Sequence, residues 1–278
     1  MQNANEQKLN ELIAKWNSHA KRRNIFLKWQ NERIWHEKYQ EKTIDFLEKF
    51  VPSLKTKKIL DLGSGMGGFL VAMKLKGYDV IGIEPNHDYI DIAKLRAMRY
   101  GIDIDARENS GEKMPFPDDS IDFIYCNDVL EHCENPSELL KESFRILKEN
   151  GQMHITVINR FGFHDAHYHL KFINWMPRFL GEMIIKLNNI EKENSTAGMQ
   201  KLSSMHYFTV WQFKKMARES GFDVVDLKKY KILHPELIAD SKFQKISKIF
   251  RFARMGSFIY FLAVFYLSSF SFMLKKTK

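Results

Sequence analysis

Residues 59–68 of this 278-residue chain, ILDLGSGMGG, place a glycine-rich turn directly after a short apolar run. A glycine turn between a strand and a helix lets a ligand approach the backbone, and free amides at the helix start can bind its polar groups. Glu84 ends the next apolar run, 21 residues after Gly63. An acid at that place can accept hydrogen bonds from both hydroxyls of a ribose, so the pair predicts a nucleotide site. The glycines also satisfy GxGxxG, which keeps dinucleotide binding open.

Histidines supply the second set of candidates, because imidazole is the usual base near neutral pH. His132 closes the segment VLEH, and three more histidines with one aspartate form HDAHYH at 164–169. The latter segment follows an expected strand, at the edge where open α/β sheets bind ligands. Metal binding, proton removal or substrate contact, and a plain polar loop are its three interpretations. We select His132, His164 and His167 as catalytic candidates and assign no metal ligand.

Apolar periodicity predicts the elements that position these residues. Strand and helix alternate five times over about 100 residues, which is typical of a parallel sheet with helices on both faces. The expected strands are 58–62, 79–84, 102–106, 121–126 and 152–158, and the helices are 69–76, 88–100 and 136–148. Helical residues 5–50 precede this core. Helices 177–190 and 210–220 and a strand at 222–231 follow it.

Four motifs in order carry a family resemblance: LDLGSGMGGFL, IGIEPN, GEKMPFPDDSIDFIYCNDVLEH and ESFRILKENGQMHIT. They resemble the successive motifs of class I S-adenosylmethionine-dependent methyltransferases of the small-molecule, UbiE-like group. The resemblance implies a Rossmann-like α/β fold, a doubly wound seven-stranded sheet with an antiparallel last strand. It covers about residues 57–160, and weaker similarity continues to 230. NAD enzymes do not resemble the third and fourth motifs.

The resemblance implies S-adenosylmethionine as cofactor and assigns roles by position. Gly63, Ser64, Gly65 and Gly67 would hold its methionine part, and Asp61 would orient the loop and contact the amino group. Glu84 would take the ribose. The remaining contacts would come from Pro85 as an apolar wall, Gly111 and Glu112 beside the adenine, and Asn127 facing cofactor and substrate. Ser110 departs from the family pattern, because many relatives have Asp there for the adenine amino group.

The cofactor determines the reaction class. A sulfonium methyl is already electrophilic, so the protein mainly aligns a nucleophile with it. We expect O-methylation of a small-molecule, glycan or lipid-linked hydroxyl. A quinone or other lipid phenol is the second enzyme hypothesis, RNA methylation the third, and an inert cofactor-binding scaffold the non-enzymatic one. No (N/D/S)PP(Y/F) tetrad, Pro-Cys nucleophile or added RNA-binding module supports nucleic acid as a partner.

Charge is concentrated at one end of the chain. Residues 1–200 hold 28 basic and 29 acidic side chains, whereas residues 201–278 hold 15 and 5. A helix at 241–254 would be basic and amphipathic, so peripheral contact with an anionic membrane through residues 241–267 is one expectation, and a solvated face is the other. The uncharged run 255–274 divides at Ser268-Ser269. We expect a helix and a closing strand there, with interfacial insertion and a transmembrane segment as alternatives.

We expect one methyltransferase domain over residues 1–278. It would comprise an N-terminal helical extension (1–52), a cofactor-binding core (53–159), an aromatic helical cap that binds substrate or merely covers the core (160–205), and a C-terminal closure (206–278). Two cysteines without a CxxC pattern indicate reduced thiols, and the polar N-terminus shows no signal peptide. Both favour a cytoplasmic protein, which would be membrane-peripheral if the basic end meets lipid.

Overall fold

The computed structural model describes residues 2–16, 31–188, 201–234 and 256–277. The basic amphipathic helix expected at 241–254 lies outside the described residues. The strands are β1 (Lys58–Leu62), β2 (Asp79–Glu84), β3 (Asp105–Glu108), β4 (Ile121–Cys126), β5 (Leu147–Ile158), β6 (Phe222–Asp226) and β7 (Ser269–Lys276). The α-helices are α1 (Gln2–Trp16), α3 (Glu41–Phe50), α4 (Gly68–Leu75), α5 (His87–Met98), α6 (Pro136–Ile146), α7 (Arg178–Leu187), α8 (Val210–Glu219), α9 (Leu227–Leu233) and α11 (Gly256–Val264). Short 3-10 turns are η2 (His36–Gln40), η3 (Leu54–Thr56), η4 (Ile173–Trp175) and η5 (Leu202–Ser204).

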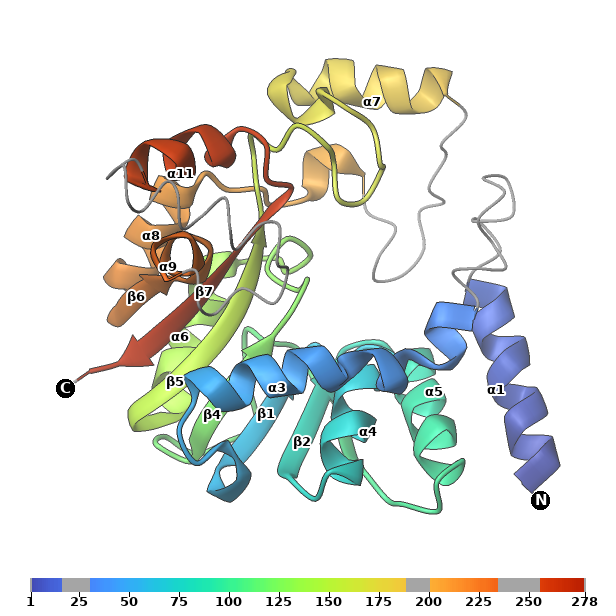
Figure 1. Cartoon of the computed structure of the whole chain (residues 1–278). Coiled ribbons are helices and arrows are strands. Elements are labelled where there is room, and N and C mark those ends of the chain that lie inside the picture. The colour runs from blue at the N-terminus through green and yellow to red at the C-terminus, as the bar shows by residue number, and fades with distance from the viewer. Residues whose placement is uncertain (1, 17–30, 189–200, 235–255, 278) are drawn as a thin grey trace. The chain divides into compact units, whose positions relative to one another are not determined.

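The strands form one seven-stranded sheet in the order β3-β2-β1-β4-β5-β7-β6 (Figure 1). Strand β1 pairs in parallel with β2 and β4, and β2 pairs in parallel with β3. Strands β6 and β7 pair antiparallel, with Val224 opposite Leu274. The alternating Phe270, Phe272 and Leu274 are buried, as expected for a closing strand. The Rossmann-like sheet with an antiparallel last strand is thus confirmed.

Contacts between Cα atoms divide the chain into two compact units. The glycine-loop unit comprises residues 1–126 and 145–152, and the cap unit comprises residues 127–144 and 153–278. Each unit is described by itself below.

The glycine-loop unit is built around the buried strands β1 and β2 with helices α4 and α5 (Figure 1). Helix α1 packs against α5 through a buried cluster of Leu9, Ile13, Ile92 and Leu95. Met66 of the glycine turn packs against the same cluster. The N-terminal extension therefore belongs to the structure around the glycine turn.

The cap unit has its own apolar core, formed by Ile158, Tyr168, Ile173, Ile185, Leu202, Met205 and Tyr207. These side chains come from the end of β5, the segment after it, α7 and the stretch before α8. Helix α8 begins at a capping box in which Thr209 and Gln212 bond reciprocally. The expected cap at 160–205 is thus a packed structure in its described part.

Several element predictions need correction. Helix α6 ends at Ile146 rather than at residue 148, and the helical run expected over 5–50 contains the 3-10 turn η2. The strand expected at 222–231 ends at Asp226, because the Asp226 carboxylate caps a new helix by accepting from the Lys229 amide at 3.0 Å. Strand β3 occupies Asp105–Glu108 rather than 102–106, and β5 starts at Leu147, five residues before the expected position. None of the helices in the described part of the chain combines the length and apolar character needed to cross a bilayer.

Candidate functional site

The glycine turn after β1 is held tightly against β2. The Gly63 and Ser64 amides both donate to the Ile83 carbonyl at 2.9 Å. Gly67 has φ +75°, and a Cβ there would lie 2.5 Å from the Ala93 Cβ, so only glycine fits between turn and helix α5. A Cβ at Gly65 would meet nothing within 4 Å. The turn is therefore packed on one side and has open space at Gly65, where a ligand can approach the backbone.

Glu84 lies at the end of β2 beside this turn and is 5% exposed. Its carboxylate accepts from the Gly65 amide at 2.9 Å and from the Asn86 amide at 3.0 Å. Burial raises the pKa of Glu84, and these two amides oppose the rise. A carboxylate has about four acceptor positions, so two remain for a pair of ribose hydroxyls. This geometry suits the role expected of Glu84.

Asp61 near the end of β1 is a buried acid with one unsatisfied oxygen. It is 3% exposed, and its Oδ2 has no hydrogen-bond partner. Burial, followed by the charge of Glu84, raises the pKa of Asp61 to about 8. A cationic ligand group would favour the ionised form. The ammonium and sulfonium of S-adenosylmethionine are such groups, so the buried acid fits that cofactor.

The residues expected around the adenine form a small polar loop. The Ser110 hydroxyl donates to a Glu112 carboxylate oxygen at 2.8 Å, and the Glu112 amide donates back to the Ser110 hydroxyl at 3.3 Å. The Asn109 amide donates to the Glu84 carbonyl at 3.2 Å, which ties this loop to the end of β2. Gly111 is half-buried and Pro85 is exposed. Ser110, which replaces the usual acid, thus supports Glu112.

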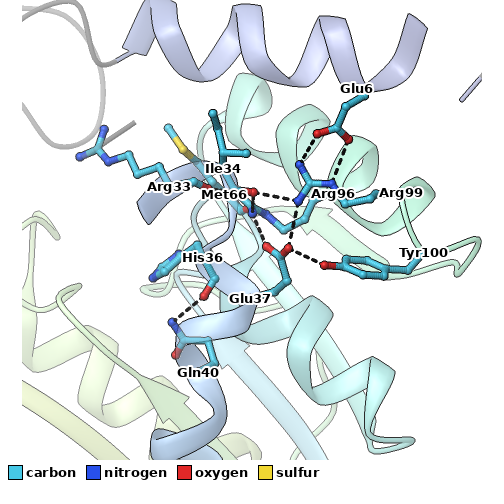
Figure 2. A network of polar contacts seen from close by, with 10 residues as sticks. All are labelled: Glu6, Arg33, Ile34, His36, Glu37, Gln40, Met66, Arg96, Arg99 and Tyr100. Atoms are coloured by element: carbon cyan, nitrogen blue, oxygen red, sulfur yellow. Dashed lines mark hydrogen bonds and ion pairs between the residues drawn. The ribbon is translucent and has the colours of Figure 1, made fainter. Parts of the chain in front are cut away.

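A buried arginine fastens the N-terminal extension to the glycine turn (Figure 2). Arg96 of α5 is fully buried, and its Nε donates to the Met66 carbonyl of the turn at 2.9 Å. Its other nitrogens donate to the Ile34 carbonyl at 2.8 Å, the Arg33 carbonyl at 2.6 Å and the Glu37 carboxylate. One guanidinium therefore holds two segments of the site.

The network continues outward through Arg99 (Figure 2). Arg99 bonds Glu37 at 2.9 Å and Glu6 of α1 at 2.7 Å, and the Tyr100 hydroxyl also donates to Glu37 at 2.7 Å. His36 lies against the start of α4, where a Cβ on Gly68 would come within 2.3 Å of its Nδ1. Burial, then the charge of Arg96, lowers the pKa of His36 to about 4, so this imidazole is neutral.

The second candidate site lies in the cap unit, in the segment that follows β4. Glu131 is 1% exposed, and its Oε1 lies 3.3 Å from the His167 Nε2 and 3.9 Å from the His132 Nε2. The two imidazole rings meet edge to face with centroids 5.1 Å apart. Desolvation, then the charge of Glu131, raises the pKa of Asp128, which precedes Glu131 by three residues. We call Glu131, His132 and His167 the carboxylate–imidazole centre.

Asp165 holds His167 in this centre. Its buried carboxylate accepts from the His167 amide at 2.9 Å, the Tyr168 amide and the Tyr207 hydroxyl at 2.9 Å. Burial, reinforced by Asp165, raises the pKa of Tyr207, so its hydroxyl stays protonated as a donor. The Tyr207 ring stacks on His167 with centroids 6.2 Å apart. The loop carrying His167 is thus anchored to the segment before α8.

The structure separates the expected histidines. His132 and His167 meet around Glu131, whereas the ring of His164 lies 5.7 Å from that of His169. Asn127 follows β4 directly, and its amide donates to Asp128 at 2.8 Å. His154 is buried in the core and forms a hydrogen bond with the Ser271 hydroxyl at 2.9 Å.

Glu131 was not selected from the sequence, although it stands in the VLEH motif beside His132, and Asp165 was weighed only as part of the histidine segment at 164–169. One donor atom from each residue of the carboxylate–imidazole centre lies within 4.8 Å of the others, so these three residues could hold a metal ion.

Comparisons with known proteins identify the family of this chain. A family model described as a methyltransferase domain matches residues 35–227. Ubiquinone biosynthesis O-methyltransferase of Pseudomonas putida strain W619 is 35% identical over 112 residues, which cover 39% of this chain and 47% of the relative. The same enzyme of Pseudomonas savastanoi pv. phaseolicola is 33% identical over 111 residues, or 38% and 47%. The match thus spans about half the length of these relatives.

Solved structures agree on the fold. YcgJ of Bacillus subtilis matches with a TM-score of 0.52 at 14% identity and covers 85% of this chain and 98% of its own. Phosphoethanolamine N-methyltransferase 2 of Haemonchus contortus, solved in complex with S-adenosyl-L-methionine, matches with 0.53 at 17%, covering 85% and 52%. Because the family model spans more than half of the sequence, the chain belongs to the methyltransferase-domain family.

Proposed function

We propose that this chain transfers the methyl group of S-adenosylmethionine to a hydroxyl oxygen. Its family supports methyl transfer, and the relatives named O-methyltransferases support oxygen as the acceptor atom. The open turn at Gly65, the buried Glu84 and the unsatisfied Asp61 suit the cofactor's backbone contacts, ribose and cationic groups. Glu84 was selected from its spacing to the glycine turn, whereas the cofactor roles of Gly65 and Asp61 were taken from the family resemblance.

In the proposed reaction the acceptor oxygen attacks the methyl carbon in line with the sulfur. A carbon–oxygen bond forms, the carbon–sulfur bond breaks, and the sulfur keeps the electron pair to give S-adenosylhomocysteine. The hydroxyl proton must leave, because a neutral hydroxyl is a weak nucleophile. Residues 127–132 follow β4 and residues 159–169 follow β5. The ends of strands in open α/β sheets are where such groups are usually placed.

The observation that carries this proposal is the carboxylate–imidazole centre. It combines a buried acid with two imidazoles at 3.3 and 3.9 Å, and Asp165 fixes one of them. Such a centre can bind a hydroxyl and take up or delocalise its proton. His164 remains a candidate for acceptor contact, because it stands in the same loop but pairs with His169.

Labelled methyl transfer into lipid, glycan, RNA and small-molecule fractions tests the function. We expect His132→Ala and His167→Ala each to lower turnover by about 100-fold or more while cofactor affinity is nearly kept. His234→Ala, which removes a ring stacked on Tyr230 at 4.2 Å, serves as the matched control. Unchanged turnover in both site variants would exclude the centre from the reaction, and exclusive labelling of RNA would overturn the acceptor assignment.

An exposed aromatic surface of the cap unit favours a lipid or lipid-linked acceptor. Around α11, Phe258, Phe261, Leu262 and Phe265 follow a 3/4 spacing and are 39% to 55% exposed. Rings of the cap segment join them, because Phe163 stacks on Tyr266 at 5.9 Å and Phe161 lies 6.3 Å from Phe265. Lys171 and Arg160 flank these rings at 6.0 and 5.9 Å. Aromatic rings with flanking cations suit the interface of an anionic membrane.

Cosedimentation with vesicles tests this part of the proposal. The native chain should bind vesicles rich in anionic lipid more strongly than neutral ones, and Phe261→Asp with Phe265→Asp should reduce that binding. Trp211→Asp, at a 53% exposed aromatic of α8, is the control. Equal binding by the native chain and the double variant would remove the lipid assignment and leave O-methylation in place.

A further inference from the structure

Glu131 is a buried carboxylate that lacks hydrogen-bond donors among the described residues and faces two imidazoles at 3.3 and 3.9 Å. The side chain is fully buried, and neither carboxylate oxygen has a hydrogen-bond partner. The facing His167 Nε2 also lacks one. Buried carboxylates are nearly always hydrogen-bonded, paired with a cation or bound to a metal, because burying an uncompensated charge costs several kcal/mol. A protonated imidazole or a bound cation would supply the compensating positive charge.

The donor atoms are spaced for a single metal ion. Two ligands that each lie about 2.1 Å from an ion are at most about 4.2 Å apart. The separations from Glu131 Oε1 are 3.3 Å to His167 Nε2 and 3.9 Å to His132 Nε2, both inside that limit. The three donors together lie within 4.8 Å, so the two imidazoles need to close by less than 1 Å.

The surrounding structure supports these ligands from behind. The Glu131 carbonyl accepts from the His206 amide at 3.0 Å, and the Asp165 carboxylate fixes the His167 backbone at 2.9 Å. Asp128, whose amide and carboxylate both bond Thr156, places a second acid in the same segment. Ligands whose position is fixed by hydrogen bonds are a feature that metal sites share.

We propose that Glu131, His132 and His167 bind one divalent transition-metal ion. Two imidazoles and one carboxylate suit ions of the Mn²⁺ to Zn²⁺ series better than Mg²⁺ or Ca²⁺, which prefer oxygen ligands. Three protein ligands leave coordination positions open, as in catalytic sites. This inference rests on the proposed function for its chemical role, because an ion of this kind would lower the pKa of a hydroxyl bound to it, so that the proton is lost to solvent near neutral pH.

Direct binding measurements test the site without any assay of activity. The full-length chain is stripped with EDTA and titrated with Mn²⁺, followed by electron paramagnetic resonance, and with Zn²⁺ in a calorimeter. Co²⁺ reports the ligand geometry through its visible absorption. We expect about one ion per chain, and binding at least about tenfold weaker in Glu131→Gln and in His167→Ala. His164→Ala, a histidine of the same loop outside the centre, should bind as the native chain does.

The possible results distinguish failure of the metal site from failure of the proposed function. Absence of saturable binding up to about 1 mM ion, or unchanged affinity in Glu131→Gln, would overturn the proposal. Full methyl transfer by the stripped chain would show that the ion has no role in the reaction. A protonated imidazole would then neutralise Glu131, and O-methylation would remain the proposed function. Metal binding without methyl transfer to any fraction would refute the proposed function instead. Asp165→Asn offers a second variant if Glu131→Gln fails to fold, and it should weaken binding through His167.

Discussion

The buried arginine network of Figure 2 yields a prediction about how the N-terminal extension supports the glycine turn. Replacing Arg96 by Met keeps most of the side-chain volume and removes every hydrogen bond of the guanidinium. The Ile34 carbonyl and Glu37 keep Arg99 as a donor at 2.8 and 2.9 Å, whereas the Met66 and Arg33 carbonyls lose the Arg96 donor. Each buried carbonyl left without a donor costs about 1–3 kcal/mol.

Breaking a buried ion pair by removing one partner costs about 3–5 kcal/mol, so we expect Arg96→Met to destabilise the chain by about 4 kcal/mol. Glu37→Gln should cost a similar amount, because it leaves two guanidinium groups that are 0% and 9% exposed without their shared anion. The double variant should be less destabilised than the sum of the single variants by at least about 1 kcal/mol.

Urea denaturation followed by circular dichroism measures these free energies of unfolding. Arg107→Met is the matched control, because Arg107 bonds Asp105 at 2.6 Å on the surface, with both side chains over 40% exposed. That substitution should cost less than about 1 kcal/mol. Two results would refute the claim that this network stabilises the glycine turn. One is a decrease of less than about 1 kcal/mol in the free energy of unfolding of Arg96→Met, and the other is full additivity of Arg96→Met with Glu37→Gln.

Two further predictions concern protons. Cofactor binding at pH 7 should release up to about one proton per chain, because burial raises the pKa of Asp61 to about 8 and a cationic ligand favours its ionised form. Calorimetry in buffers of different ionisation enthalpy measures this release. Equal heats in all buffers, or unchanged release in Asp61→Asn, would contradict it. The free energy of unfolding should be largest above pH 6.5 and fall towards pH 4, because the unfolded chain protonates His36 before the folded chain does, the folded pKa being about 4. Urea midpoints at several pH values test this, and a His36→Gln variant with the same pH slope as the native chain would refute the assignment.

The arrangement of Gly65 beside Glu84 could be predicted from the sequence, because it depends on residues that are close together in the chain. Strands β1, β2 and β4 have the expected bounds, since each is an apolar run flanked by polar or glycine residues. Gly65 lies in the turn after β1 and Glu84 is the last residue of β2, and parallel pairing of the two strands brings them to a 2.9 Å hydrogen bond. A pattern within about 25 residues therefore predicted the arrangement.

The rest depends on contacts between distant residues. Glu37 and Arg96 stand 59 positions apart and were indistinguishable from charges on solvated helix faces. Glu131 and His167 lie 36 positions apart, and the burial of that carboxylate arises only when the cap folds onto the segment after β4. The strand expected at 222–231 was wrong beyond Asp226, because the side chain of Asp226 caps a helix that begins at Leu227. Alternation of apolar residues does not reveal such a side-chain to backbone hydrogen bond.

Binding of S-adenosylmethionine to Glu84→Gln in a calorimeter tests the central claim most directly. The change removes the charge that we propose to face the ribose hydroxyls, and a charged hydrogen bond is worth about 1.5–3 kcal/mol, so affinity should fall by about tenfold or more. Glu108→Gln, an exposed acid at the end of the neighbouring β3, should bind as the native chain does. Undiminished binding by a folded Glu84→Gln chain, or no binding by the native chain, would contradict the cofactor site described above.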